Sequence, residues 1–180
     1  RRPIMAILIS PMIVPIIITA TGLFFFYSKI GISHWSVFGW EIPYLGVILA
    51  HATLGIPFVI ITVTATLVGF DHSLTRAAAN LGANPRTTFF KIIMPLILPG
   101  VISGGLFAFV TSFDEVVVVL FIGGLDEQTI PRQMWNGIRE QISPAILSVA
   151  TILVIISTLL LATIELLRRR SEKLRGITPH

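Results

Sequence analysis

The chain has 180 residues, of which 54% are hydrophobic and only 12% are charged, with a formal net charge of +4. Average soluble domains carry about 25% charged residues, so this composition argues against a soluble domain and favours a membrane protein. Cysteine is absent, which excludes disulfides and thiolate metal sites.

Four apolar segments are long enough to cross a membrane, because a helix spanning ~30 Å of hydrocarbon needs about 20 residues. They cover residues 4–26, 44–68, 93–111 and 145–167. Backbone groups in lipid must bond within their own segment, so these spans are expected to be helices. The predicted fold is therefore all-α: a polytopic membrane helix bundle forming one transmembrane domain over residues 1–180.

Prolines interrupt these segments and predict kinks, because each removes a backbone donor. They are Pro11, Pro15, Pro57, Pro95 and Pro99. The third segment also contains Gly100 and Gly104, one helical turn apart. Small residues at this spacing allow two membrane helices to approach closely, so a packing role is expected for them.

Lysine and arginine indicate the orientation of the spans. Of the 13 such residues, only Lys29, Arg132 and Arg139 lie in the loops after the first and third segments. The others precede the first span, follow the fourth, or lie between the second and third. The positive-inside rule places this larger set in the cytoplasm. Both ends of the chain and the 69–92 loop are therefore expected on the cytoplasmic side.

The 69–92 loop has the pattern of a small folded unit. Ser73 is a suitable helix N-cap, and Leu74, Ala77, Ala78 and Leu81 would form one apolar stripe on the helix that follows. Gly82 can take the left-handed conformation that ends a helix, and Asn84-Pro85 marks a turn into a second helix. Periodicity alone leaves open whether this helix pair docks on a protein or rests on lipid headgroups.

Three ionisable residues are candidates for a substrate pathway. His51 lies inside the second span, where a polar side chain needs a partner, so an interhelical hydrogen bond and a pathway role both stay open. Asp114 and Glu115 follow the third span at its expected outer end. Neighbouring helical residues point about 100° apart, so at most one of them should face a central pathway. Both acids could instead mark the water boundary.

The residues of the 76–95 stretch resemble the "EAA" loop of permease subunits in bacterial ATP-binding cassette (ABC) importers. That pattern is Glu-Ala-Ala, three residues, Gly, nine residues, then Ile-x-Leu-Pro. The matching positions here are Ala77, Ala78, Gly82, Ile92 and Pro95. Arg76 stands at the usual Glu position and reverses its charge.

Two further stretches resemble the spermidine/putrescine-type permeases within this family. They are "SFDE" at 112–115, which favours Asp114 as the pathway acid, and "TIPRQMWNGIREQISP" at 129–144. Family members usually have six spans, so the resemblance implies that the four spans here correspond to the last four. It also implies that the loop residues, Arg76 and Pro85 included, form the coupling helix that docks on the ATPase subunit.

The resemblance implies a transport subunit of the bacterial inner membrane that moves a small solute, most simply a polyamine such as spermidine or putrescine. Its implied partners are a dimer of ATP-binding subunits, a second permease subunit and an extracytoplasmic solute-binding protein, in contact with membrane lipid and without nucleic acid. The sequence contains no Gly-Lys pair and so no P-loop, and its four histidines show no metal-ligand spacing. No enzyme activity, metal or cofactor is expected, and ATP hydrolysis is assigned to the partner subunit.

Alternatives stay open at this point. The solute could be an opine, an amino acid derivative or ferric ion. A carrier driven by an ion gradient would be expected to place ionisable groups at the bilayer midplane, where only His51 lies. A structural membrane subunit without a pathway is a third possibility.

Overall fold

The computed structural model describes residues 2–32, 36–37, 40–140 and 143–174. This part of the chain is helical apart from one short ribbon, in which β1 (Ser36–Val37) pairs antiparallel with β2 (Trp40–Glu41). The all-α prediction missed this ribbon. Among the described residues, three helices are long and apolar enough to cross a membrane, or four if a bent pair at the start counts as one span.

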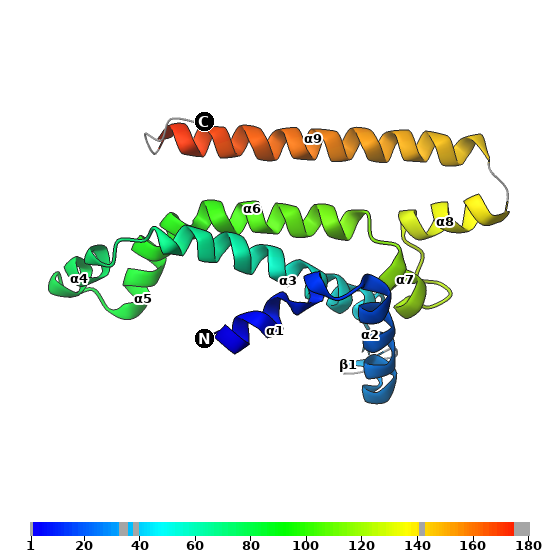
Figure 1. The fold of residues 1–180 in the computed structure, drawn as a ribbon, viewed down its shortest axis with the longest axis horizontal. Coiled ribbons are helices and arrows are strands. Elements are labelled where there is room, and N and C mark those ends of the chain that lie inside the picture. Colours follow the sequence, from blue (N-terminus) through cyan, green and yellow to red (C-terminus); the bar gives the residue numbers. More distant parts are fainter. Residues whose placement is uncertain (1, 33–35, 38–39, 141–142, 175–180) are drawn as a thin grey trace.

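Three of the predicted spans coincide with long helices. These are α3 (Leu45–Val68), α6 (Met94–Phe113) and α9 (Pro144–Leu174). Figure 1 shows α3 and α6 lying side by side along the long axis of the molecule, with α9 running along the other side of α6. Pro57 and Pro99 lie inside α3 and α6 without ending them.

The first predicted span is not one straight helix. It is divided into α1 (Arg2–Ile13) and α2 (Ile16–Ile30), which are bent by 108° relative to each other. Pro15 stands at the break with an extended backbone, φ −53° and ψ 134°, and has no N–H to continue the helical ladder. With 12 residues, α1 is about 18 Å long, too short to cross the hydrocarbon alone.

The contact between α3 and α6 depends on glycines of α6, as the spacing of Gly100 and Gly104 predicts. A Cβ on Gly104 would lie 2.7 Å from the Val59 Cα, and one on Gly100 would lie 3.0 Å from the Thr62 carbonyl oxygen. Real Cβ atoms essentially never come as close to backbone as at Gly104 and seldom as close as at Gly100, so glycine at these positions lets the two helices lie this near to each other. The packing interpretation of this glycine pair is confirmed.

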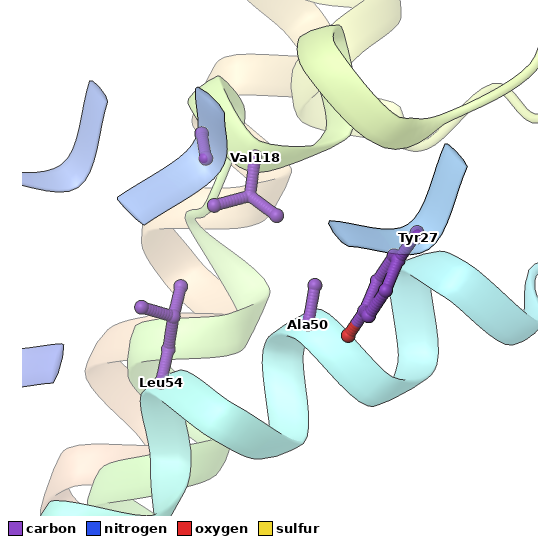
Figure 2. Packing of buried hydrophobic residues seen from close by; sticks show 5 residues of the cluster. Tyr27, Ala50, Leu54 and Val118 are labelled. Atoms are coloured by element: carbon purple, nitrogen blue, oxygen red, sulfur yellow. The ribbon is translucent and has the colours of Figure 1, made fainter. Parts of the chain in front are cut away.

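Buried side chains gather where α2 and α3 meet α7 (Val117–Ile122). Figure 2 shows Tyr27 of α2, Ala50 and Leu54 of α3, and Val118 of α7 directed toward one another. Val118 is fully buried. This cluster fixes the start of α3 against α7, at the end of the molecule where α6 also finishes.

The two ends of the molecule differ in structure. At one end, α4 (Ser73–Asn80), α5 (Pro85–Thr88) and the π-helical turn η2 (Phe89–Ile93) connect α3 to α6. Figure 1 shows α4 and α5 projecting beyond the ends of α3 and α6, at the same end as the carboxyl end of α9. At the opposite end, α7 and α8 (Ile130–Glu140) connect α6 to α9.

Candidate functional site

A cavity of about 1020 Å³ lies along the contact between α3 and α6. The start of α8 and Leu153 of α9 complete its wall. Most of the lining is aliphatic or aromatic, and a few polar side chains interrupt it, among them His51, Ser112, Glu115 and Thr129. An apolar cavity with a small number of placed polar groups is the usual form of a small-molecule site.

His51 reaches across this contact to the neighbouring helix. Its Nδ1 lies 2.6 Å from the Ser112 Oγ, which joins α3 to the last turn of α6. The interhelical hydrogen bond that the sequence left open is therefore present. The other ring nitrogen, Nε2, is buried and has no partner among the described residues. The imidazole thus makes a packing contact between two helices and contributes to the cavity wall, while its second ring nitrogen stays buried.

The two acids after α6 lie in different environments. Asp114 follows the last residue of α6 and is exposed, and it is not part of the cavity lining. Glu115 is buried and lies in the cavity wall. Its Oε1 accepts a hydrogen bond of 2.9 Å from the Val118 amide, which satisfies a free N–H in the first turn of α7. Only one acid faces the cavity, as expected, but it is Glu115 and not the favoured Asp114.

A polar network closes the end of the molecule next to the cavity. The Arg132 guanidinium is buried, and its Nη1 donates to the carbonyl oxygens of Gly124 and Glu127 at 2.7 and 2.8 Å. The Glu127 carboxylate accepts from the Tyr44 amide at 2.7 Å and from the Gly124 amide at 3.0 Å. The connection between α7 and α8 is therefore tied to the first residues of α3.

The sequence indicates no structural role for Glu127, and it presents Arg132 only as a charge in a loop. Their partners are mostly backbone groups, and one of these is the amide of Tyr44, 83 positions away from Glu127. No pattern along the chain reports such a contact. Tyr44 itself has a positive φ of 61°, a conformation that its residue type does not predict.

At the other end of the molecule, α4 begins at Ser73 itself, and the side chain that accepts its first free amide comes from Asp71, two residues earlier. The Asp71 carboxylate, and not the Ser73 hydroxyl, receives the first orphan amide: Oδ1 accepts from the Ser73 N–H at 2.8 Å, and Oδ2 accepts from the Ser73 hydroxyl at 2.6 Å. These hydrogen bonds, the hydroxyl bond first, lower the pKa of Asp71 below its ordinary value of 3.8. The Ser73 prediction is wrong because both residue types cap helices and the aspartate lies closer to the free amide.

The turn between α4 and α5 agrees with the sequence. Gly82 has φ +80°, the left-handed conformation expected after a helix. The Asn84 Oδ1 accepts from the Thr87 amide at 2.8 Å, and Pro85 is the first residue of α5. Arg76 and Ala77 are exposed on α4, while Ala78 is buried against the rest of the chain.

The remaining two residues of the motif lie where this connection enters α6. Ile92 belongs to the π-helical turn η2 and is half-buried. Pro95 is the second residue of α6 and directly follows this π-helical turn. The structure therefore gathers the first four motif residues, together with Pro85, on the projecting end and leaves these two at the junction with the bundle.

Comparison with known proteins identifies the family to which this arrangement belongs. Residues 1–173 match the family described as "Binding-protein-dependent transport system inner membrane component". The chain belongs to this family. It is a permease component of a binding-protein-dependent transport system, as the motif at 76–95 indicated.

Several curated relatives are permeases of polyamine transport systems. The spermidine/putrescine transport system permease protein PotC of Haemophilus influenzae is 32% identical over 172 residues, which cover 96% of this chain and 64% of the relative. PotC of Escherichia coli K12 is also 32% identical, over 93% of this chain and 60% of its own length. The putrescine transport system permease protein PotI of E. coli K12 is 32% identical over 80% of this chain and 50% of the relative. The chain thus spans one half to two thirds of these relatives.

Proposed function

We propose that this permease component belongs to an ABC importer and forms part of the pathway for a small organic cation, a polyamine such as spermidine or putrescine. The observation that carries the proposal is the Glu115 carboxylate in the wall of the cavity between α3, α6 and α9. The printed names of the relatives support the same solute class.

The composition of the cavity wall fits the chemistry of a polyamine. Such a molecule alternates ammonium groups with short methylene chains, so it needs separated acceptors on an otherwise apolar surface. Glu115 supplies a negative charge, and His51 and Ser112 add polar side chains to the same wall. The Arg132 and Glu127 network bounds this region on the side that the positive-inside rule assigns to the exterior.

In the proposed importer, the projecting α4–α5 end contacts a dimer of ATP-binding subunits, which hydrolyse ATP. A second permease subunit completes the pathway, and an extracytoplasmic binding protein delivers the solute. The full permease has six spans, of which this chain supplies the last four, and both ends of the chain are cytoplasmic. The folded α4–α5 connection, with its left-handed Gly82 and capped second helix, supports a docking role.

A pair of isosteric variants tests the pathway assignment in the complete transporter reconstituted in vesicles. Glu115→Gln keeps an oxygen that can accept from the Val118 amide, so it removes the charge and preserves the start of α7. We expect it to lower polyamine uptake about tenfold, the scale of one charge-assisted contact. Asp114→Asn, the matched control, lies outside the cavity and should transport at a near-normal rate. Near-normal uptake by both variants would contradict the pathway role of this cavity.

A further inference from the structure

The projecting end of the molecule carries a basic surface made by three exposed side chains. Arg76 lies on α4, Arg86 on α5 and Lys91 on η2. Between Gly69 and Pro95 the sequence contains a single acid, Asp71, and both of its oxygens are held by Ser73. The positive charge of this surface is therefore not neutralised from within the connection.

Arg76 is the member of this surface best placed to meet a partner. The buried Ala78 marks the side of α4 that faces the rest of the chain. Arg76 and Ala78 are two positions apart, which is about 200° of rotation around a helix, so Arg76 points away from that side. Its guanidinium has no hydrogen bond or ion pair within the described part of the chain. The fork of donors on an arginine matches a carboxylate in a two-bond contact.

We infer that the ATP-binding subunit paired with this chain presents an acidic side chain, Asp or Glu, opposite Arg76. This rests on the proposed function, in which α4 docks on that subunit. The resemblance implies an acid at position 76 in other permeases, and the arginine found here reverses the charge that the partner must complement. A protein partner suits Arg76 better than a lipid headgroup does, because α4 projects beyond the ends of the spans.

The test uses the complete transporter, purified through a tag on this chain, and measures how much ATP-binding subunit is retained. Like charges brought together at an interface are strongly unfavourable, so Arg76→Glu should reduce retention about tenfold or more in ~0.1 M salt. Wild-type retention should weaken in ~1 M salt, where the screening length falls from ~10 Å to ~3 Å. Arg76→Gln should show a smaller salt dependence than the wild type.

Two further variants separate the possible explanations. Arg139→Glu makes the same change of charge on an exposed residue of α8, at the opposite end, and should retain the subunit as the wild type does. Gly82→Glu places a bulky side chain at a left-handed position and should release the subunit if α4–α5 is the docking element at all. If Gly82→Glu releases the subunit and Arg76→Glu retains it fully, the inference of an acidic residue opposite Arg76 is wrong and the proposed docking through α4–α5 stands. If both variants retain the subunit fully, the inference and the proposed docking are both wrong.

A compensating change gives the strongest support. Replacing the facing Asp or Glu of the ATP-binding subunit by Arg should restore retention of Arg76→Glu. Vesicles of phosphatidylcholine with and without phosphatidylglycerol test whether Arg76 instead binds an anionic lipid headgroup. If Arg76→Glu keeps the subunit but its transport no longer depends on phosphatidylglycerol, Arg76 faces a headgroup and the inference is wrong.

Discussion

At the scale of single residues, His51 lies both in the contact between two helices and in the wall of the proposed pathway. Its Nδ1 is paired with Ser112 on the facing helix, and its Nε2 is buried without a partner among the described residues. Polar pairs between membrane helices contribute modestly, about 0.5–2 kcal/mol, because the separated helices also find partners. The pair should therefore affect stability slightly and leave assembly intact.

A double-mutant cycle separates the two roles of His51. We expect His51→Ala and Ser112→Ala to lower the thermal stability of the purified transporter by similar small amounts, with little further loss in the double variant, because each removes the same hydrogen bond. Polyamine uptake should fall further in His51→Ala than in Ser112→Ala, since only the former removes a whole ring from the cavity wall. Additive losses of stability, or equal losses of uptake, would show that the two roles are not combined in this residue.

At the scale of secondary structure elements, the close contact of α3 with α6 depends on where glycine occurs. Gly104 faces the backbone of α3 at Val59, whereas a Cβ on the adjacent Gly105 would meet no atom within 4 Å. Gly104 and Gly105 are both glycines of α6, and they differ in the direction that they face. They therefore provide a matched pair for measuring what the contact contributes.

We expect Gly104→Ala to destabilise the protein by about 1–3 kcal/mol, because a methyl group there overlaps backbone that cannot move aside independently. Gly105→Ala should be neutral or slightly stabilising, since alanine favours a helix over glycine by about 1 kcal/mol. Thermal unfolding of the two variants in the same detergent compares them directly. Equal unfolding temperatures would show that the α3–α6 contact is looser than described.

The elements that the sequence predicts best are those defined by local patterns. The long apolar runs place α3, α6 and α9 within a few residues of their bounds, apart from the carboxyl end of α9. Gly82 and Asn84-Pro85 predict the turn after α4, because left-handed backbone and proline geometry are properties of single residues. The motif at 76–95 likewise identifies the family before any contact is known.

The features missed by sequence reasoning depend on contacts between distant segments. Pro15 predicts a kink, but the size of the bend between α1 and α2 depends on packing of α2 against α7. Asp114 and Glu115 are adjacent acids after the same span, so periodicity does not show which of them enters the cavity. That depends on where α6 ends, at Phe113. The Glu127–Tyr44 contact joins positions too far apart for any periodicity to report.

At the scale of the whole molecule, the two sites that we propose lie at different positions along one helix pair. The cavity with His51 and Glu115 lies along α3 and α6, and α4 and α5, the proposed docking surface, connect the far ends of the same helices. Figure 1 shows this continuity directly. A displacement of α4–α5 by a partner subunit would therefore act on both walls of the cavity through the tightly packed α3–α6 contact.

The central claim is that this chain is part of an ATP-driven polyamine importer, and uptake by the complete transporter tests it most directly. The transporter, reconstituted in vesicles with its binding protein, is supplied with labelled spermidine or putrescine, and ferric ion and an opine are tested in parallel. We expect polyamine accumulation that requires both ATP and the binding protein and that continues when ion gradients are abolished. Uptake driven by an ion gradient without ATP, or transport of ferric ion or an opine with no polyamine uptake, would contradict it.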